Sequence, residues 1–255
     1  MKTILIQFDT DPQPSVFDRV VAVDSGVENL FSYASVTPEN VTALTHGAMF
    51  TRGPADLKNT AIFVGGSDVS QGEALMKKIQ KTFFVPMRVS VMMDSNGCNT
   101  TAAAAIASAR KHLSLKGSKA IVLGATGPVG LRAAELLAME GAEVTLVSRT
   151  TDRAAQACDF VKSKQSDAIV HAKAAGTTAE YEAVCQGHEI VVAAGAAAVT
   201  FLPEGALSRI AGLKLAIDVN AVPPLGLADI GVMDKAVEKS GVICYGALGV
   251  GGRDI

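Results

Sequence analysis

The sequence predicts an α/β protein made of two domains, each built around a largely parallel sheet. Short apolar runs alternate with helical patterns along all 255 residues, which is typical of parallel α/β sheets. Several of these runs are continuously apolar, as strands covered on both faces are. The polar, glycine-containing segment Leu113–Lys119 separates two such blocks. We therefore expect an N-terminal α/β domain over residues 1–112, a C-terminal Rossmann-type domain over residues 113–255, and an interdomain cleft.

The elements follow one another in a regular order. The expected helices include Ser15–Asp24, which has apolar Val16, Val20 and Val23 at near-helical spacing, Glu73–Thr82, the alanine-rich Thr101–His112, and one that runs through Met139 and ends at Gly141. The expected strands are Thr3–Phe8, Leu30–Ala34, Thr60–Val64, Arg88–Met92, Ala120–Gly124, Glu143–Val147, Ala168–Val170, Glu189–Ala193, Leu215–Ile217 and Val242–Cys244.

Composition excludes several classes of function. With 23 basic and 25 acidic residues, a net charge of −2 and no tryptophan, the chain has neither the basic patch nor the stacking platform of a nucleic-acid binder. The N-terminal apolar run breaks at Gln7 and Asp9, too early for a signal peptide, and no run is long enough for a membrane span. The 4 cysteines and 4 histidines are scattered, so we expect a cytoplasmic protein with reduced thiols and no metal site.

A glycine-rich segment between an apolar strand and an amphipathic helix carries the clearest motif. It has the pattern Gly-x-x-Gly-x-x-Gly, whose glycines permit a tight turn, a close approach to a pyrophosphate, and close helix–strand packing. The N-terminus of the following helix offers N–H groups and a positive dipole end to phosphates. The segment predicts a dinucleotide site that includes Gly124, Thr126, Gly127, Pro128, Val129 and Gly130.

The end of the next strand indicates which dinucleotide binds. An NAD enzyme usually has Asp or Glu there for the ribose hydroxyls, whereas this strand ends in Ser148, Arg149 and Thr150, with Arg153 one turn later. Arg149 can pair with a 2′-phosphate, which an acidic residue would repel, and the hydroxyls can add donors. We therefore expect NADP, with NAD the less favoured cofactor.

Small residues follow two later strands. Ala194 and Gly195 follow one, and the stretch Gly246–Gly252, which includes Gly249, follows the other. Such residues would let the nicotinamide half of the cofactor pass close to the backbone. Tight packing explains them equally well.

Three polar clusters follow predicted strands, where open α/β sheets bind ligands. Asn99 or Thr100 can also serve as the N-cap of the alanine-rich helix, but the clusters are denser than one cap requires. We predict Asp218 as both a substrate-binding and a cofactor-binding residue. The other predicted substrate-binding residues are Asp9, Thr10, Asp94, Ser95, Asn96, Asn99, Asn220 and Pro223.

With these motifs, the chain resembles the bacterial NADP-dependent methylene-tetrahydromethanopterin and methylene-tetrahydrofolate dehydrogenases of one-carbon metabolism. The resemblance covers essentially the whole chain. It implies a two-domain enzyme, a homo-oligomer that is a trimer in some relatives, and a reduced pterin as substrate. It rests on Gln7–Asp11, Pro14–Asp18, Ala61–Gly66, Asp94–Gly97, Asn99–Thr101, Thr126–Gly130, Asp218–Ala221 with Pro223 and Pro224, and Gly246–Gly249.

The implied reaction moves a hydride from the methylene bridge of the pterin to the nicotinamide and leaves a methenyl cation. Because no proton moves with the hydride, no catalytic acid or base is assigned, and catalysis rests on positioning. Bifunctional folate dehydrogenase–cyclohydrolases carry a Tyr-x-x-x-Lys pair. Here no lysine lies four residues after Tyr33, Tyr181 or Tyr245, so we expect no cyclohydrolase activity.

The end of the chain departs from the family pattern. Relatives typically continue beyond Arg253–Ile255 with a helical tail. A tail with substrate contacts is therefore either missing from this sequence or not part of this member.

Three alternatives remain open at this stage. The segment Asp218–Pro224 looks most like the methanopterin enzymes, but methylene-tetrahydrofolate as sole or additional substrate stays possible. A shikimate-dehydrogenase-like NADP oxidoreductase would need a Lys–Asp pair in the first domain, and no such motif surrounds Lys58. A non-catalytic NADP-sensing module would not need the polar clusters.

Overall fold

The chain forms two compact units, which divide after Asn99 in the computed structural model. The structure describes residues 1–250, so Gly251, Gly252 and Arg253–Ile255 lie outside the described residues. The division falls near the start of helix α4 (Cys98–Arg110), whereas the sequence places it just beyond that helix, after His112. Each unit has its own sheet.

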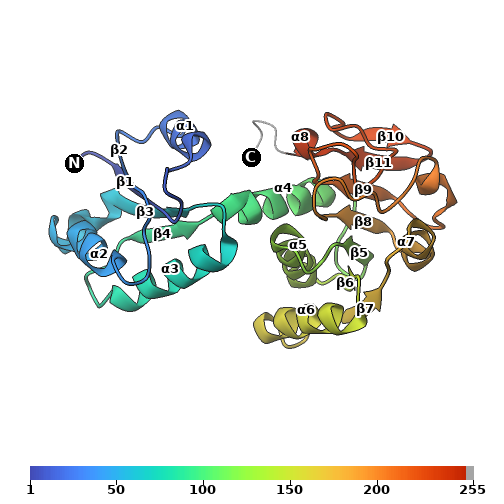
Figure 1. Ribbon diagram of the computed structural model, residues 1–255, viewed down its shortest axis with the longest axis horizontal. Coiled ribbons are helices and arrows are strands. Elements are labelled where there is room, and N and C mark those ends of the chain that lie inside the picture. Colours follow the sequence, from blue (N-terminus) through green and yellow to red (C-terminus); the bar gives the residue numbers. More distant parts are fainter. Residues whose placement is uncertain (251–255) are drawn as a thin grey trace. The chain divides into compact units, whose positions relative to one another are not determined.

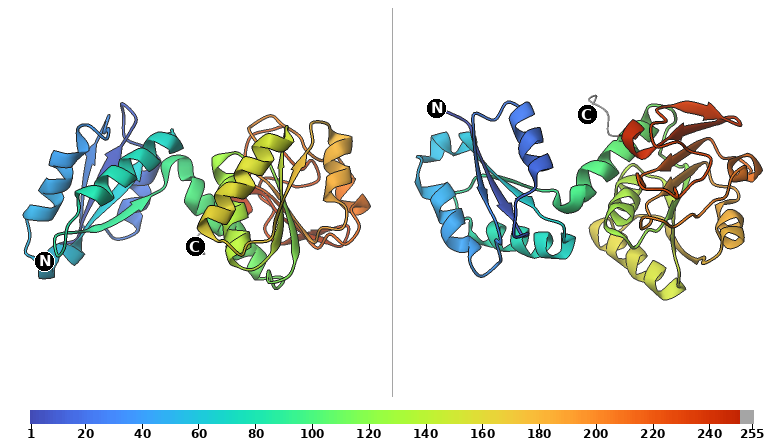
Figure 2. Two further views of the ribbon diagram at one scale, coloured as in Figure 1. Left: turned by 90° about the horizontal axis from the view of Figure 1, so that it is seen from below. Right: turned by 45° about the horizontal axis from the view of Figure 1, so that its top comes forward.

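The first unit contains a four-stranded, fully parallel sheet in the order β2-β1-β3-β4 (Figure 1). Right-handed crossovers place α1 on one face, and α2 and α3 together on the other (Figure 2). In register, Asp9 at the end of β1 pairs with Gly65 at the end of β3. The elements are β1 (Ile4–Asp9), α1 (Val16–Asp24), β2 (Asn29–Tyr33), α2 (Val41–Phe50), η1 (Pro54–Asn59), β3 (Thr60–Gly65), α3 (Val69–Thr82), β4 (Ser90–Met93) and η2 (Ser95–Gly97).

The second unit contains a seven-stranded sheet in the order β10-β11-β9-β8-β5-β6-β7, in which β10 is antiparallel to β11. The strand order reverses between β5 and β8, which is the point where such sheets bind ligands. Its elements after α4 are β5 (Lys119–Leu123), α5 (Pro128–Met139), β6 (Glu143–Ser148), α6 (Thr151–Lys164), β7 (Val170–Ala174), α7 (Thr178–Cys185), β8 (Ile190–Ala193), η3 (Ala206–Arg209), β9 (Leu215–Asp218), β10 (Val237–Lys239), β11 (Val242–Tyr245) and α8 (Ala247–Val250).

Alternating residues of these strands face two apolar clusters, one on each side of the sheet. Helices α4, α5 and α6 cover one side. Helix α7 and the segment 201–213 cover the other. Figure 2 shows the helices on the two sides of this sheet. All four cysteines are buried, and burial raises the pKa of the Cys185 thiol to about 12 and that of Cys244 to about 11.

The parallel α/β architecture predicted from the sequence is confirmed, and every predicted strand is present. Strand β7 runs over Val170–Ala174 rather than Ala168–Val170, and it does not begin at Ala168 because the Ala168 N–H bonds back to the Gln165 carbonyl in a turn. Helices α2, α6, α7 and α8 and strand β10 were not predicted. Within residues 1–250, no helix combines the length and apolar character needed to cross a bilayer.

Candidate functional site

The glycine-rich segment forms the turn between β5 and α5. Gly124 has φ +75°, and a Cβ there would lie 2.8 Å from the Cα of Gly195. A Cβ on Gly130 would lie 2.5 Å from the carbonyl oxygen of Gly124, so α5 approaches the end of β5 as closely as glycine allows. The ends of β5 and β8 and the start of α5 therefore converge at this turn.

Gly127 differs from its two neighbours in the motif because it has space around it. It is the N-cap of α5 with φ −79°, and a Cβ there would lie 3.4 Å from its nearest neighbour, the carbonyl oxygen of Gly124. Pro128 occupies the first helical position, where its missing N–H costs nothing. The N–H groups of Val129 and Gly130 belong to the first turn, which has no intrahelical acceptors for them. The turn thus presents donors and an open backbone.

A pocket of about 270 Å³ opens beside this turn. It brings together the ends of β5, β6 and β8 with one residue of α6 and one of α7. Eight of the residues predicted to bind the cofactor line it, namely Gly124, Thr126, Gly127, Ser148, Arg149, Arg153, Ala194 and Gly195. Four further lining residues were not predicted, namely Tyr181, Ala196, Val199 and Phe201.

The end of β6 supplies the polar side of the pocket. Ser148 is buried, with its hydroxyl 3.4 Å from that of Thr126. Arg149 and Arg153 are exposed, and no acidic residue lines the described pocket. Thr150 is instead the N-cap of α6, where its hydroxyl accepts the Arg153 N–H. Two guanidinium groups and two hydroxyls suit a phosphate better than they suit ribose hydroxyls.

Two other predicted cofactor residues have structural partners. Gly249 lies in α8, where a Cβ would collide with the carbonyl oxygen of Asp234, so the residue permits close packing. Asp218 is buried and accepts the N–H groups of Asn220 at 3.0 Å and Leu227 at 2.8 Å. Burial raises the pKa of Asp218, and the backbone hydrogen bonds oppose that rise.

The loop between Asp218 and Leu227 carries two predicted substrate residues. The Asn220 side chain accepts the Val222 N–H at 3.0 Å and donates to the Pro224 carbonyl at 3.2 Å. Pro223 is exposed within this loop. Asp218 and Asn220 therefore shape the loop, and Pro223 lies on its surface.

In the first unit, the predicted carboxylates lie at strand ends and organise the local backbone. Asp9 is fully buried and accepts the N–H groups of Asp11 at 2.9 Å and Ser15 at 3.0 Å. Asp94, after β4, accepts the Asn99 N–H at 2.8 Å. The predicted capping role of Asn99 or Thr100 is wrong, because α4 begins at Cys98 and Asp94 provides the acceptor.

The other predicted residues of this cluster differ in accessibility. Ser95 is buried and donates to the Gly65 carbonyl at 3.2 Å. The Thr10 hydroxyl is buried against Gly66 and has no hydrogen-bond partner among the described residues. Asn96 is exposed with φ +54°, in the left-handed region that asparagine tolerates. Of these three side chains, Asn96 is the one presented to solvent.

Sequence reasoning missed Asp18 as a member of this cluster. A Cβ on Gly65 would lie 3.1 Å from an oxygen of Asp9 and 3.2 Å from an oxygen of Asp18, so both carboxyl groups meet above this glycine. Burial raises the pKa of Asp18, the hydrogen bond from Ser15 lowers it, and the charges of Asp9 and Asp94 raise it further. A carboxylate in this position has the chemistry to attract a cation.

Comparisons with known proteins agree on one family. Residues 16–96 match the model of the N-terminal domain of methylene-tetrahydromethanopterin dehydrogenase. The chain is 46% identical over 253 residues to the bifunctional protein MdtA of Methylorubrum extorquens AM1, covering 98% of this chain and 88% of the relative. It is 31% identical to the NAD(P)-dependent methylenetetrahydromethanopterin dehydrogenase of the same strain, covering 93% of this chain and 82% of the relative.

The fold recurs in more distant dehydrogenases. Quinate dehydrogenase from Corynebacterium glutamicum, solved with NAD, superimposes with a TM-score of 0.59 at 14% identity, over 98% of this chain and 89% of that one. At that identity the likeness concerns the fold alone. The two curated relatives match nearly the whole chain at the sequence level, and the chain therefore belongs to the methylene-tetrahydromethanopterin dehydrogenase family.

Proposed function

We propose that this protein is an NADP-dependent dehydrogenase that oxidises the methylene group of methylene-tetrahydromethanopterin to the methenyl form. The observation that carries the proposal is the pocket of the second unit, where an open glycine turn faces Arg149 and Arg153 with no acidic residue in the lining. Family membership supplies the substrate class.

The residues present fit the proposed cofactor. The backbone at Gly127 would hold the pyrophosphate, because the space that a Cβ would fill there is open. Arg149, Arg153 and Ser148 would hold the 2′-phosphate through charge-assisted hydrogen bonds. When bound, the nicotinamide ring supplies the hydride acceptor. Ala194 and Gly195 line the other side of the pocket without bulk.

The carboxylates of the first unit fit a substrate that becomes a cation. Loss of a hydride from the methylene bridge leaves a positive charge shared by two nitrogens, and no proton has to move. Asp9, Asp18 and Asp94 would place negative charge beside the pterin and stabilise that charge as it develops. Backbone hydrogen bonds hold the carboxylates of Asp9 and Asp94 in place before the substrate arrives.

Spectrophotometry of methenyl formation tests the reaction directly. The full chain is mixed with NADP and, separately, with methylene-tetrahydromethanopterin and methylene-tetrahydrofolate. We expect turnover with the methanopterin substrate, and the ratio of specificity constants states how far folate is also used. Tight NADP binding without turnover of either pterin would contradict the reaction and favour the sensing module.

We further propose a cytoplasmic homo-oligomer without cyclohydrolase activity. Helix α1 leaves Val16 71% and Phe17 77% exposed, more apolar surface than a monomer usually leaves on one short helix. No described tyrosine has the lysine spacing of the cyclohydrolases. Because we propose no cyclohydrolase activity, we expect the protein to leave the hydrolysis of the methenyl-pterin at its uncatalysed rate.

A further inference from the structure

One polar group in the pocket has no partner within the protein. Tyr181, on α7, is only 6% exposed and lines the pocket, yet its hydroxyl makes no hydrogen bond within residues 1–250. Buried tyrosine hydroxyls usually find a partner. Tyr245, which is 3% exposed in the same unit, follows that rule with a 2.7 Å bond to Nε2 of His112. The Tyr181 hydroxyl has no protein partner within the described residues and, unlike the unpartnered hydroxyls of Thr10 and Thr60, it is not buried, so it is available to a ligand in the pocket that Tyr181 lines.

The ring that carries this hydroxyl is held firmly. Tyr181 packs edge-on against Phe201 with ring centroids 4.8 Å apart and an interplanar angle of 73°. Phe201 is itself 4% exposed and lies against Gly195, where a Cβ would collide with its ring. The two aromatic rings thus form one rigid wall of the pocket.

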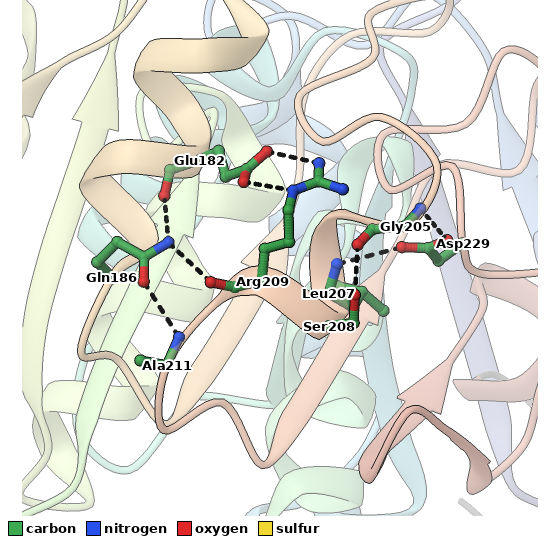
Figure 3. Close-up of polar contacts among 8 residues, drawn as sticks. All are labelled: Glu182, Gln186, Gly205, Leu207, Ser208, Arg209, Ala211 and Asp229. Atoms are coloured by element: carbon green, nitrogen blue, oxygen red, sulfur yellow. Dashed lines mark hydrogen bonds and ion pairs between the residues drawn. The ribbon is translucent and has the colours of Figure 1, made fainter.

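Helix α7 is anchored to the segment that follows Phe201, as Figure 3 shows. Both carboxylate oxygens of Glu182 accept from Arg209, each at 2.7 Å. Gln186 donates to the carbonyl oxygens of Glu182 and Arg209 and accepts the Ala211 N–H at 3.1 Å. These contacts fix the helix before any ligand binds, so little ordering is needed on binding.

The position of the wall relative to the phosphate groups indicates its ligand. The pyrophosphate belongs at Gly127 and the 2′-phosphate at Arg149, and the base is attached to the same ribose as the 2′-phosphate. The lining left for that base includes Tyr181, Val199 and Phe201. On the basis of the proposed NADP site, we propose that Tyr181 is a cofactor-binding residue whose hydroxyl donates a hydrogen bond to a ring nitrogen of adenine.

The ionisation of the phenol supports its role as a donor. Burial raises the pKa of Tyr181, and the charge of Arg149 opposes that rise. The group therefore keeps its proton at neutral pH. The ring nitrogens of adenine are acceptors, so the pairing satisfies both sides.

Isothermal titration of the full chain with nucleotide fragments tests this assignment. For Tyr181→Phe, we expect the affinities for 2′,5′-ADP and for 5′-AMP to fall by the same factor, about three- to tenfold. The affinity for nicotinamide mononucleotide, which lacks adenine, stays at the parent value. The ring and its packing against Phe201 are retained in this variant, so the protein remains folded.

Tyr245→Phe is the matched control, because it also removes the hydroxyl of a tyrosine in the same unit but outside the described pocket. It should leave all three affinities unchanged. A loss confined to 2′,5′-ADP would overturn the adenine assignment, because the hydroxyl would then contact the 2′-phosphate. Unchanged affinities for Tyr181→Phe would overturn the inference while leaving the proposed function intact. A parent chain that binds no 2′,5′-ADP would contradict the proposed function itself.

Discussion

At the scale of single residues, Arg149 is the side chain that we expect to contribute most to the preference for NADP over NAD. It lies at the end of β6, beside Ser148 and one turn before Arg153, and it lines the pocket. An acidic side chain in this place would pair with ribose hydroxyls and repel a phosphate. The guanidinium group of Arg149 instead attracts a phosphate. This one side chain therefore places a positive charge where an NAD enzyme has a negative one.

Replacing this side chain should remove the preference for the phosphate without removing dinucleotide binding. For Arg149→Ala, we expect the Kd for NADP to rise by about tenfold to a hundredfold, the size of a lost charge-assisted hydrogen bond, while the Kd for NAD stays near the parent value. Titration of both cofactors measures this. Arg110→Ala, which removes an exposed arginine paired with Glu140, should change neither constant. Equal losses for both cofactors would contradict a role in phosphate recognition.

The site residues show where sequence reasoning reaches its limit. The roles of Arg149 and Gly127 were predictable because each belongs to a short motif whose residues are neighbours along the chain. Tyr181 and Phe201 were not, because their meeting depends on the packing of α7 against the segment after β8. Asp18 was missed for the same reason, since α1 has to fold back over Gly65 before its carboxyl group approaches Asp9.

At the scale of elements, the three glycines of the turn between β5 and α5 have three different structural roles. Gly124 provides a positive φ, Gly130 provides contact between helix and strand, and Gly127 provides an open backbone at the pocket. The first two therefore serve the fold, whereas the third serves the ligand. This division is testable because the same substitution has opposite consequences at two positions.

Adding one methyl group separates the two roles. Gly130→Ala should lower the free energy of unfolding by about 1–3 kcal/mol, because the Cβ would lie 2.5 Å from the Gly124 carbonyl oxygen. Gly127→Ala should leave stability unchanged or raise it by up to about 1 kcal/mol, because its φ of −79° suits alanine. It should nevertheless weaken NADP binding by about tenfold or more. Urea denaturation and titration measure the pair, and an unstable Gly127→Ala would contradict the assignment.

The elements also show which parts of the fold the sequence predicts well. Buried strands such as β5 and β8 are continuous apolar runs, and they stand out whatever surrounds them. Helix α6 was missed because Thr150, its N-cap, was interpreted only as a ligand donor. Strand β10 is short and largely exposed, and its pairing depends on the Ser240–Gly241 turn, where both residues have positive φ.

At the scale of the whole molecule, the apolar stripe of α1 is a surface that the rest of the first unit leaves uncovered. The spacing of Val16, Val20 and Val23 predicts the helix correctly, yet these side chains are 71%, 53% and 60% exposed, and Ala22 is the buried residue of the helix. Periodicity identifies an apolar face but does not say what covers it. We expect another copy of the chain to cover this one.

A charge placed on this stripe tests the assembly. We expect the parent to have a mass in solution that is a multiple of 26.3 kDa, and Phe17→Glu to shift it toward 26.3 kDa, because a carboxylate would have to be desolvated at the interface. Light scattering after gel filtration measures this. Met139→Glu, which alters an exposed methionine at the end of α5, should keep the parent mass. A monomeric parent would contradict the expectation.

The burial of all four thiols has a consequence for the chemical setting in which the protein would work. A methylene group held between two nitrogens is at the oxidation level of an aldehyde, and hydrolysis of such a bridge releases that aldehyde. Thiolates add readily to aldehydes, but all four thiols are buried, and the pKa values of about 12 for Cys185 and about 11 for Cys244 keep those two protonated. The fold therefore keeps its thiols away from the aldehyde that hydrolysis of its proposed substrate would release.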